Sequence, residues 1–243
     1  LQIVGTLAPT IAALVVGARE EGAVAVFSYA YAVFLLPFSL FAAPVATAML
    51  PRLALFNERR DTESAASVFR GAYRPALVAL TFAAISLLAV GESLARILSF
   101  GLIAENGLSD YSTSIQWLGV GVVGYGIWFI CVRSMMAFGE VRKSALVTVL
   151  GAVTGITSMP IGLLLFPDTA VAVVLAASIS IGFSLCGVVA TVLRPVATRS
   201  GNLFGSGSSI LAIGTGLFAY LAMSIGLQNF IAPSNRLEAI AVL

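Results

Sequence analysis

The sequence predicts an all-α fold, a polytopic bundle of about seven transmembrane helices followed by a truncated eighth. Composition is the first reason: 59% of the 243 residues are hydrophobic and 10% are charged, whereas a soluble domain usually carries about 25% charged residues. The second reason is that the apolar residues fall into charge-free runs close to the roughly 20 residues that cross the hydrocarbon core of a bilayer. The third is that basic residues gather in every second connector between these runs.

Each expected span lies between charged residues. In chain order the expected spans are residues 1–18, 22–51, 75–91, 111–132, 144–167, 169–193 and about 204–227, with an eighth that opens at Ala239 and is cut off at Leu243. Residues 52–74 are polar and of mixed charge, so a short helix between two spans is expected there. The chain starts at Leu1 without an initiator methionine or a basic leader, which favours a longer parent chain.

The basic residues indicate how the spans cross the membrane. Ten of the thirteen lie in the connectors after the second, fourth and sixth spans; they are Arg52, Arg59, Arg60, Arg70, Arg74, Arg133, Arg142, Lys143, Arg194 and Arg199. The other connectors hold only Arg19, Arg96 and Arg236. Because basic residues near span ends favour the cytoplasmic side, the even-numbered connectors are expected to be cytoplasmic and the first span to run from inside to outside.

Several classes of function lack the residues that they need. The chain has no histidine, and its two cysteines, Cys131 and Cys186, are far apart, so the sequence holds neither a zinc signature nor a disulfide framework. No carboxylate lies inside an expected span, so acid–base chemistry within the membrane has no candidate residue. We therefore expect no enzyme, no cofactor and no metal. A net charge of +2 is too small to indicate a nucleic acid partner.

Glycines recur inside two of the expected spans. Gly119, Gly121 and Gly124 fit the GxGxxG pattern of dinucleotide sites, but that pattern needs a preceding strand. Here the glycines lie in an uncharged span, where small residues let helices approach closely. Gly151 and Gly155 form a GxxxG pair with the same interpretation. Helix packing is the function expected of both motifs.

Three prolines in the second span, Pro37, Pro44 and Pro51, recur every seven residues. Each removes a backbone donor and tends to kink a helix. One interpretation is a set of kinks whose freed carbonyls are satisfied by neighbouring helices. The other is a bent, mobile helix beside a cavity, as in transporters built from broken helices. Under this second interpretation Pro37 and Pro44 are the hinge candidates.

The sequence resembles a known family at three places. Residues 28–41 (Ser-Tyr-Ala-Tyr-Ala-Val-Phe-Leu-Leu-Pro-Phe-Ser-Leu-Phe) and 46–53 (Ala-Thr-Ala-Met-Leu-Pro-Arg-Leu) are similar to the second-half signature of the MurJ/MviN family of lipid II flippases. Residues 92–101 resemble the family's loop before the next span, and residues 133–142 resemble its aromatic-Ala-x-x-Asp-x-Arg turn. The resemblance covers about the whole chain and implies helices seven to fourteen of a fourteen-helix fold.

What the family does gives the expected function. The resemblance implies flipping of the lipid-linked cell-wall precursor lipid II across the bacterial cytoplasmic (inner) membrane by alternating access, as part of peptidoglycan biosynthesis. It implies a six-helix lobe over residues 1–193 and an additional C-terminal helix pair over residues 194–243, its second helix truncated, that lines a groove for the lipid tail. The implied partners are the lipid-linked oligosaccharide, membrane lipid and the N-terminal half of the parent chain.

The resemblance also suggests site residues. The candidate polar groups of a substrate cavity are Tyr29, Tyr31 and Gln116. The candidate cytoplasmic gate or loop contacts are Arg52, Arg133, Glu140 and Arg142. For the charged residues, a role in topology and in anchoring lipid headgroups is the alternative.

The chain departs from the family at several positions, and the turn over 133–142 has Glu140 in place of Asp and is followed by Lys143-Ser144 in place of Thr-Pro. The family often carries a cavity arginine shortly before the Leu-Pro, and this sequence has Ala32 there. An arginine would be a strong, bidentate partner for phosphate. Either the other half of the parent chain supplies the cationic site, or the substrate is another polyprenyl-linked glycan or an amphipathic drug. A non-transporting scaffold for cell-wall assembly is a third possibility.

Overall fold

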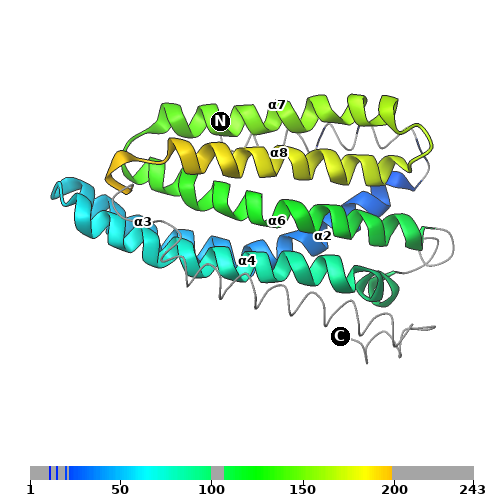
Figure 1. The fold of residues 1–243 in the computed structure, drawn as a ribbon, viewed down its shortest axis with the longest axis horizontal. Coiled ribbons are helices and arrows are strands. Elements are labelled where there is room, and N and C mark those ends of the chain that lie inside the picture. Colours follow the sequence, from blue (N-terminus) through cyan, green and yellow to red (C-terminus); the bar gives the residue numbers. More distant parts are fainter. Residues whose placement is uncertain (1–10, 12–14, 16–19, 21, 100–106, 199–243) are drawn as a thin grey trace, which may run out of the picture.

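The computed structural model describes residues 11, 15, 20, 22–99 and 107–198. Its elements are helical, and in chain order they are α2 (Ala23–Pro37), η1 (Phe38–Ala42), α3 (Ala43–Glu58), α4 (Thr62–Leu98), α6 (Leu108–Ala137), α7 (Val141–Leu165), α8 (Val171–Leu193) and η2 (Val196–Thr198). Figure 1 shows the long helices lying side by side, with α7 and α8 to one side of α6 and α4 to the other. The described part of the chain is therefore an all-α bundle.

Five helices are long and apolar enough to cross a membrane: Ala23–Glu58, Thr62–Leu98, Leu108–Ala137, Val141–Leu165 and Val171–Leu193. They coincide with the expected spans over 22–51, 75–91, 111–132, 144–167 and 169–193. The expected spans over 1–18 and 204–227, the truncated eighth, and nearly all of the expected helix pair over 194–243 lie outside the described residues.

The helix α6 lies at the centre of the bundle and packs against α2, α3, α4 and α8, while α7 packs mainly against α8. Accordingly 67% of the most apolar stretch is buried in both α6 and α8, but only 28% in α7. The exposed side of α7 is apolar, as expected of a helix that faces lipid. This arrangement leaves the bundle with α6 and α8 as its core.

Glycines allow two close approaches between the backbones of neighbouring helices. A Cβ atom added to Gly187 of α8 would lie 2.6 Å from the carbonyl oxygen of Gly124 in α6. A Cβ added to Gly182 of α8 would lie 3.0 Å from the Cα of Gly155 in α7. Only glycine fits such approaches, and close approach is how transmembrane helices gain packing energy without a hydrophobic driving force. The packing interpretation of both glycine motifs is confirmed.

The second expected span is a helix with an internal defect. Its first part, α2, ends at Pro37, the five residues of η1 form a π-helical segment, and α3 then begins one residue before Pro44. A proline provides no backbone N–H, and a wider turn is one way for a helix to accommodate that loss. The structure thus places an irregular segment between the two hinge candidates, while their motion stays a prediction.

The expectation of a separate short helix over residues 52–74 is wrong. The helix α3 continues to Glu58, and α4 already begins at Thr62. The intervening turn is tight because Arg60 adopts a left-handed backbone conformation (φ 56°) and the carboxylate of Asp61 accepts a hydrogen bond from the backbone N–H of Ser64 at 3.0 Å. This helix cap holds the pKa of Asp61 below its usual value of 3.8. The apolar side of residues 62–74 packs into the core through Ala65, Ala66, Phe69 and Tyr73.

The two ends of the bundle differ in charge. The end where α3, α6 and α8 terminate, called the basic end below, has a net charge of +5 among the described residues. Its nine basic residues are Arg52, Arg59, Arg60, Arg70, Arg74, Arg133, Arg142, Lys143 and Arg194, and its four acidic ones are Glu58, Asp61, Glu63 and Glu140. At the opposite end, one basic residue and four acidic ones give −3; they are Arg96, Glu20, Glu92, Asp110 and Asp168.

Candidate functional site

One side of α2 and α3 is not covered by any described element. Exposed residues recur on it every three or four positions, as expected of one helix face. We call this surface the open face; it consists of Tyr29, Ala32, Leu36, Leu40, Pro44, Ala48, Arg52 and Leu55. It runs through both hinge regions and carries a phenol near one end, a guanidinium near the other and apolar side chains between them.

The two tyrosines of the predicted cavity lie in different environments. Tyr29 is 56% exposed on the open face. Tyr31 instead packs against the hydrophobic core, and its ring stacks on Phe27 and Phe34 of the same helix with centroid distances of 5.8 and 5.3 Å. Tyr29 is therefore available to a ligand at the open face, whereas Tyr31 supports the helix from behind.

Tyr31 is the start of an aromatic cluster that leads into α6. Phe34 contacts Tyr125 and Phe183, and Phe38 contacts both Tyr125 and Phe129. The rings belong to α2, η1, α6 and α8, so the cluster fixes the irregular helix against the centre of the bundle. Aromatic pairs of this kind add about 0.5–1.5 kcal/mol each beyond their burial.

Arg133 lies on α6, where the aromatic cluster approaches the basic end of the bundle. Its guanidinium carbon is 5.0 Å from the centre of the Phe129 ring, a distance at which a cation is attracted to the ring face. The side chain is half-buried, and its buried Nε has no hydrogen-bond partner among the described residues. Arg133 thus combines a fixed position with unused hydrogen-bonding capacity, which suits a residue that binds an anion.

The turn from α6 to α7 holds two more of the predicted gate residues. Glu140 pairs with Lys143 at 2.8 Å, and its buried Oε2 lacks a hydrogen-bond partner within the described segments. Arg142 is exposed. The amide of Asn57, at the end of α3, donates to the carbonyl of Ala137 at 3.4 Å. This contact joins the end of the irregular helix to the turn, and Arg52, Arg133, Glu140 and Arg142 all lie at the basic end of the bundle.

Gln116 lies elsewhere. Its side-chain amide donates to the carbonyl of Leu88 in α4 at 3.3 Å, and its Cγ packs over Gly91. Gln116 therefore belongs to the contact between α4 and α6 rather than to the open face. The structure does not bring it beside Tyr29 and Tyr31.

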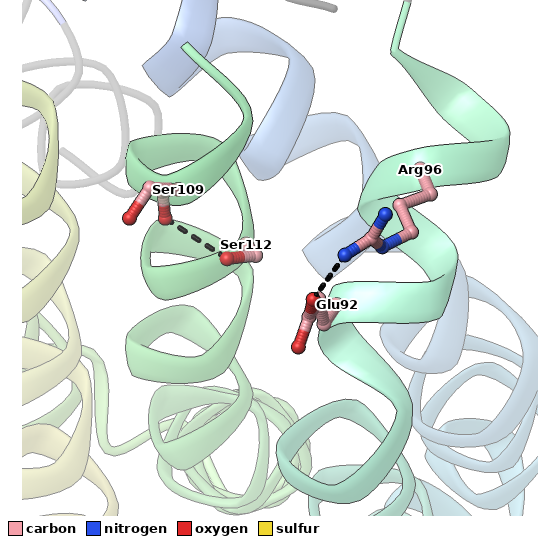
Figure 2. A network of polar contacts seen from close by, with 4 residues as sticks. All are labelled: Glu92, Arg96, Ser109 and Ser112. Atoms are coloured by element: carbon pink, nitrogen blue, oxygen red, sulfur yellow. Dashed lines mark hydrogen bonds and ion pairs between the residues drawn. The ribbon is translucent and has the colours of Figure 1, made fainter. Parts of the chain in front are cut away.

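At the end opposite the basic end, near Gln116, both α4 and α6 carry polar side chains. Figure 2 shows Glu92 and Arg96 on the last turns of α4, with Ser109 and Ser112 on the first turns of α6. Glu92 and Arg96 form an ion pair at 2.7 Å, and the hydroxyl of Ser112 donates to the carbonyl of Ser109 at 2.9 Å. An ion pair at this exposure contributes little to stability, so this group is consistent with helix ends in an interfacial, polar environment.

Sequence reasoning missed a second polar group at that end. The carboxylate of Glu20 accepts a hydrogen bond from the backbone N–H of Val171 at 2.8 Å, which ties the start of α8 to the residues before α2. Asp110 lies close enough to Glu20 to feel its charge. The only signal in the sequence was that both carboxylates flank expected spans. Glu20, which precedes α2, meets the start of α8 here, and this meeting depends on the folded topology.

The described residues contain no cluster of His, Cys, Asp or Glu that could hold a metal ion. What the open face and the basic end offer is a binding surface: a long apolar strip on an irregular helix, with arginines where it reaches the basic end. Such a surface suits an amphipathic molecule with an anionic group.

The helices define the class first: this is a multi-pass α-helical membrane protein. The family model described as "Lipid II flippase MurJ" matches residues 2–231, and the chain therefore belongs to the MurJ family. A solved structure described as "Lipid II flippase MurJ, inward closed conformation" has the same fold, with a TM-score of 0.73 at 19% sequence identity. The match covers 99% of this chain and 50% of that one, so the chain spans half the length of that relative. No match was found among curated proteins.

Proposed function

We propose that this chain is one half of a flippase that moves lipid II across the bacterial cytoplasmic membrane during peptidoglycan synthesis. The observation that carries the proposal is the match of the MurJ family model to residues 2–231. The fold is that of a lipid II flippase over 99% of the chain. The chemistry of the surface agrees, because a lipid-linked glycan combines an anionic pyrophosphate with apolar parts.

The open face is the surface that would meet the rest of the transporter. Since the chain spans half the length of the solved relative, the other half of a parent chain is the natural cover for Tyr29, Ala32 and the apolar strip. The headgroup would then bind between the two halves. Alternating access would rock one half against the other, with the irregular segment between Pro37 and Pro44 absorbing part of the motion.

The proposed orientation places the basic end in the cytoplasm. The described residues give this end a net charge of +5 and the opposite end −3, and basic residues are retained on the cytoplasmic side. Arg52, Arg133, Glu140 and Arg142 would then lie at the cytoplasmic mouth of the cavity, where lipid II enters. Within this proposal residues 1–193 form the six-helix lobe, and residues 194–243 supply a helix pair for the lipid tail.

A second candidate is transport of a different polyprenyl-linked glycan. The observation in its favour is Ala32, which is exposed on the open face at the position where the family often has a cavity arginine. Without that guanidinium the cavity loses a bidentate phosphate contact. A substrate with less negative charge near position 32 would tolerate the missing guanidinium. Lipid II would need a cation from the other half of the transporter.

Complementation tests the proposal. The gene of the full-length parent protein would be expressed in bacteria depleted of their own lipid II flippase, with membrane insertion verified by immunoblot. Restored growth with normal cell shape is the expected result. Lysis despite normal insertion would contradict lipid II transport. Rescue of a strain that lacks a different glycan-lipid flippase would then favour the second candidate, and rescue of neither strain would favour a scaffold.

A further inference from the structure

A groove lies on the surface between α4, α6 and α8, away from the open face. Its part nearer the basic end encloses about 410 Å³, and a second part of about 380 Å³ adjoins it. The two parts share Val120, Ser184 and Val188, so they form one continuous groove. Val120 and Val188 are 45% and 64% exposed, which makes the groove accessible from the membrane.

The length of the groove matches one leaflet. Along α8 its wall runs from Ser180, near the middle of that helix, to Val192 at the basic end. These twelve steps correspond to about 18 Å at about 1.5 Å per residue. Half of a hydrocarbon core of about 30 Å is about 15 Å. A transmembrane helix would need a groove of the full thickness, whereas one acyl chain needs a single leaflet.

The end of the groove at the basic end is polar and positively charged. Tyr73 and Thr191 line it there, and the hydroxyl of Thr191 donates to the carbonyl of Gly187 at 2.9 Å. Arg194 follows the end of α8 and donates to the carbonyl of Thr191 at 2.7 Å. Arg74 is exposed on α4, next to Tyr73 and one turn before Leu77 of the groove wall. Apolar walls that end beside arginines complement a lipid with an anionic headgroup.

We propose that this groove binds one acyl chain of an anionic phospholipid from the leaflet at the basic end, with the headgroup phosphate beside Arg194 and Arg74. The site is separate from the open face, and it does not depend on which lipid the protein transports. The bound lipid would fill the space between α4 and α8 over the glycine contact of the core. It would be a structural lipid, bound at one defined site rather than exchanging freely with the bilayer.

Photo-crosslinking locates the lipid without changing the protein. The full-length parent protein would be reconstituted in vesicles containing phosphatidylglycerol with a diazirine in its acyl chain, irradiated, digested and analysed by mass spectrometry. The expected result is labelling concentrated on Val120 and Val188. Labelling spread evenly over the exposed residues of α7, such as Val153 and Leu164, would overturn the proposal.

Two variants and one control distinguish the contacts of the acyl chain from those of the lipid headgroup. Val188→Trp should fill the groove and weaken retention of phosphatidylglycerol in native mass spectrometry about tenfold. Val153→Trp makes the same change on the exposed side of α7 and should bind like the wild type. Arg194→Gln should keep the lipid but lose the preference for phosphatidylglycerol over phosphatidylcholine. Equal retention by Val188→Trp and Val153→Trp would contradict the site, as would a wild type that does not distinguish the two lipids.

Discussion

Gly187 of α8 lies directly against the backbone of Gly124 in α6, so that a Cβ atom at position 187 would come within 2.6 Å of the Gly124 carbonyl oxygen and within 2.8 Å of its Cα. The obstacle is backbone, which cannot rotate away as a side chain could. The crossing of the two most buried helices therefore depends on the absence of a single methyl group. The same two glycines also line the bottom of the surface groove.

Gly187→Ala should therefore destabilise the full-length protein by about 2 kcal/mol, because inserting a methyl group into a packed contact forces the helices apart. Thermal unfolding in detergent would measure the effect as a lower midpoint. Gly71→Ala is the matched control, since nothing lies within 4 Å of a Cβ at this helical position. That change should raise stability by up to about 1 kcal/mol. Equal midpoints for the two variants would contradict the packing account.

Substitutions of Tyr31 and Tyr29 should affect different properties, stability for the first and transport for the second. Tyr31→Ala removes two ring contacts within α2 and a side chain that packs against the core, and it should cost about 2 kcal/mol of stability. Tyr29→Ala removes an exposed ring and should change stability by less than about 0.5 kcal/mol, yet reduce transport if the open face lines the cavity. Unfolding midpoints and transport rates would be measured on both. Loss of stability in Tyr29→Ala with none in Tyr31→Ala would reverse the assignment.

Cysteine labelling tests the orientation. The native Cys131 and Cys186 are 0% and 4% exposed, so they should give little background with an impermeant maleimide. Asp168→Cys, at the opposite end, should label in intact spheroplasts. Glu58→Cys, at the basic end, should label only after the membrane is permeabilised. The reverse pattern would show that the basic end faces outward.

Ala32→Arg would restore the family's cavity arginine. Ala32 is exposed, so the variant should fold, and the guanidinium should strengthen binding of a pyrophosphate. We expect more lipid II to reach the outer leaflet than with the wild type at equal expression. Ala48→Arg adds the same charge elsewhere on the open face and serves as control. An increase of the same size in Ala48→Arg would point to a general charge effect rather than to a defined phosphate contact.

Much of the fold could be predicted because a bilayer imposes simple rules. Runs without charge must be helices, and five of the expected spans coincide with described helices. The glycine contacts followed from the same reasoning, since small residues inside a span have few roles besides packing. The turn at Arg60 was missed because residues 62–74 look polar overall. Their apolar positions, such as Phe69 and Tyr73, recur at helical spacing and are buried.

The site was less predictable because it depends on which side of each helix is covered. Tyr29 and Tyr31 are two residues apart, and only the packing of α2 shows that the first is exposed and the second faces Phe27 and Phe34. A π-helical segment further along shifts the phase of the exposed residues, so a constant period could not trace the open face. Gln116 looked like a cavity residue from its polarity, but its amide is used by a carbonyl of α4.

The most direct test of the account is outward exposure of lipid II. The full-length parent protein would be produced in cells depleted of their own flippase, and an impermeant enzyme that cleaves lipid II would be added outside. The account predicts that cleavage returns to the level of undepleted cells. If the protein is inserted normally and lipid II stays protected from the enzyme, then lipid II is not what this protein carries.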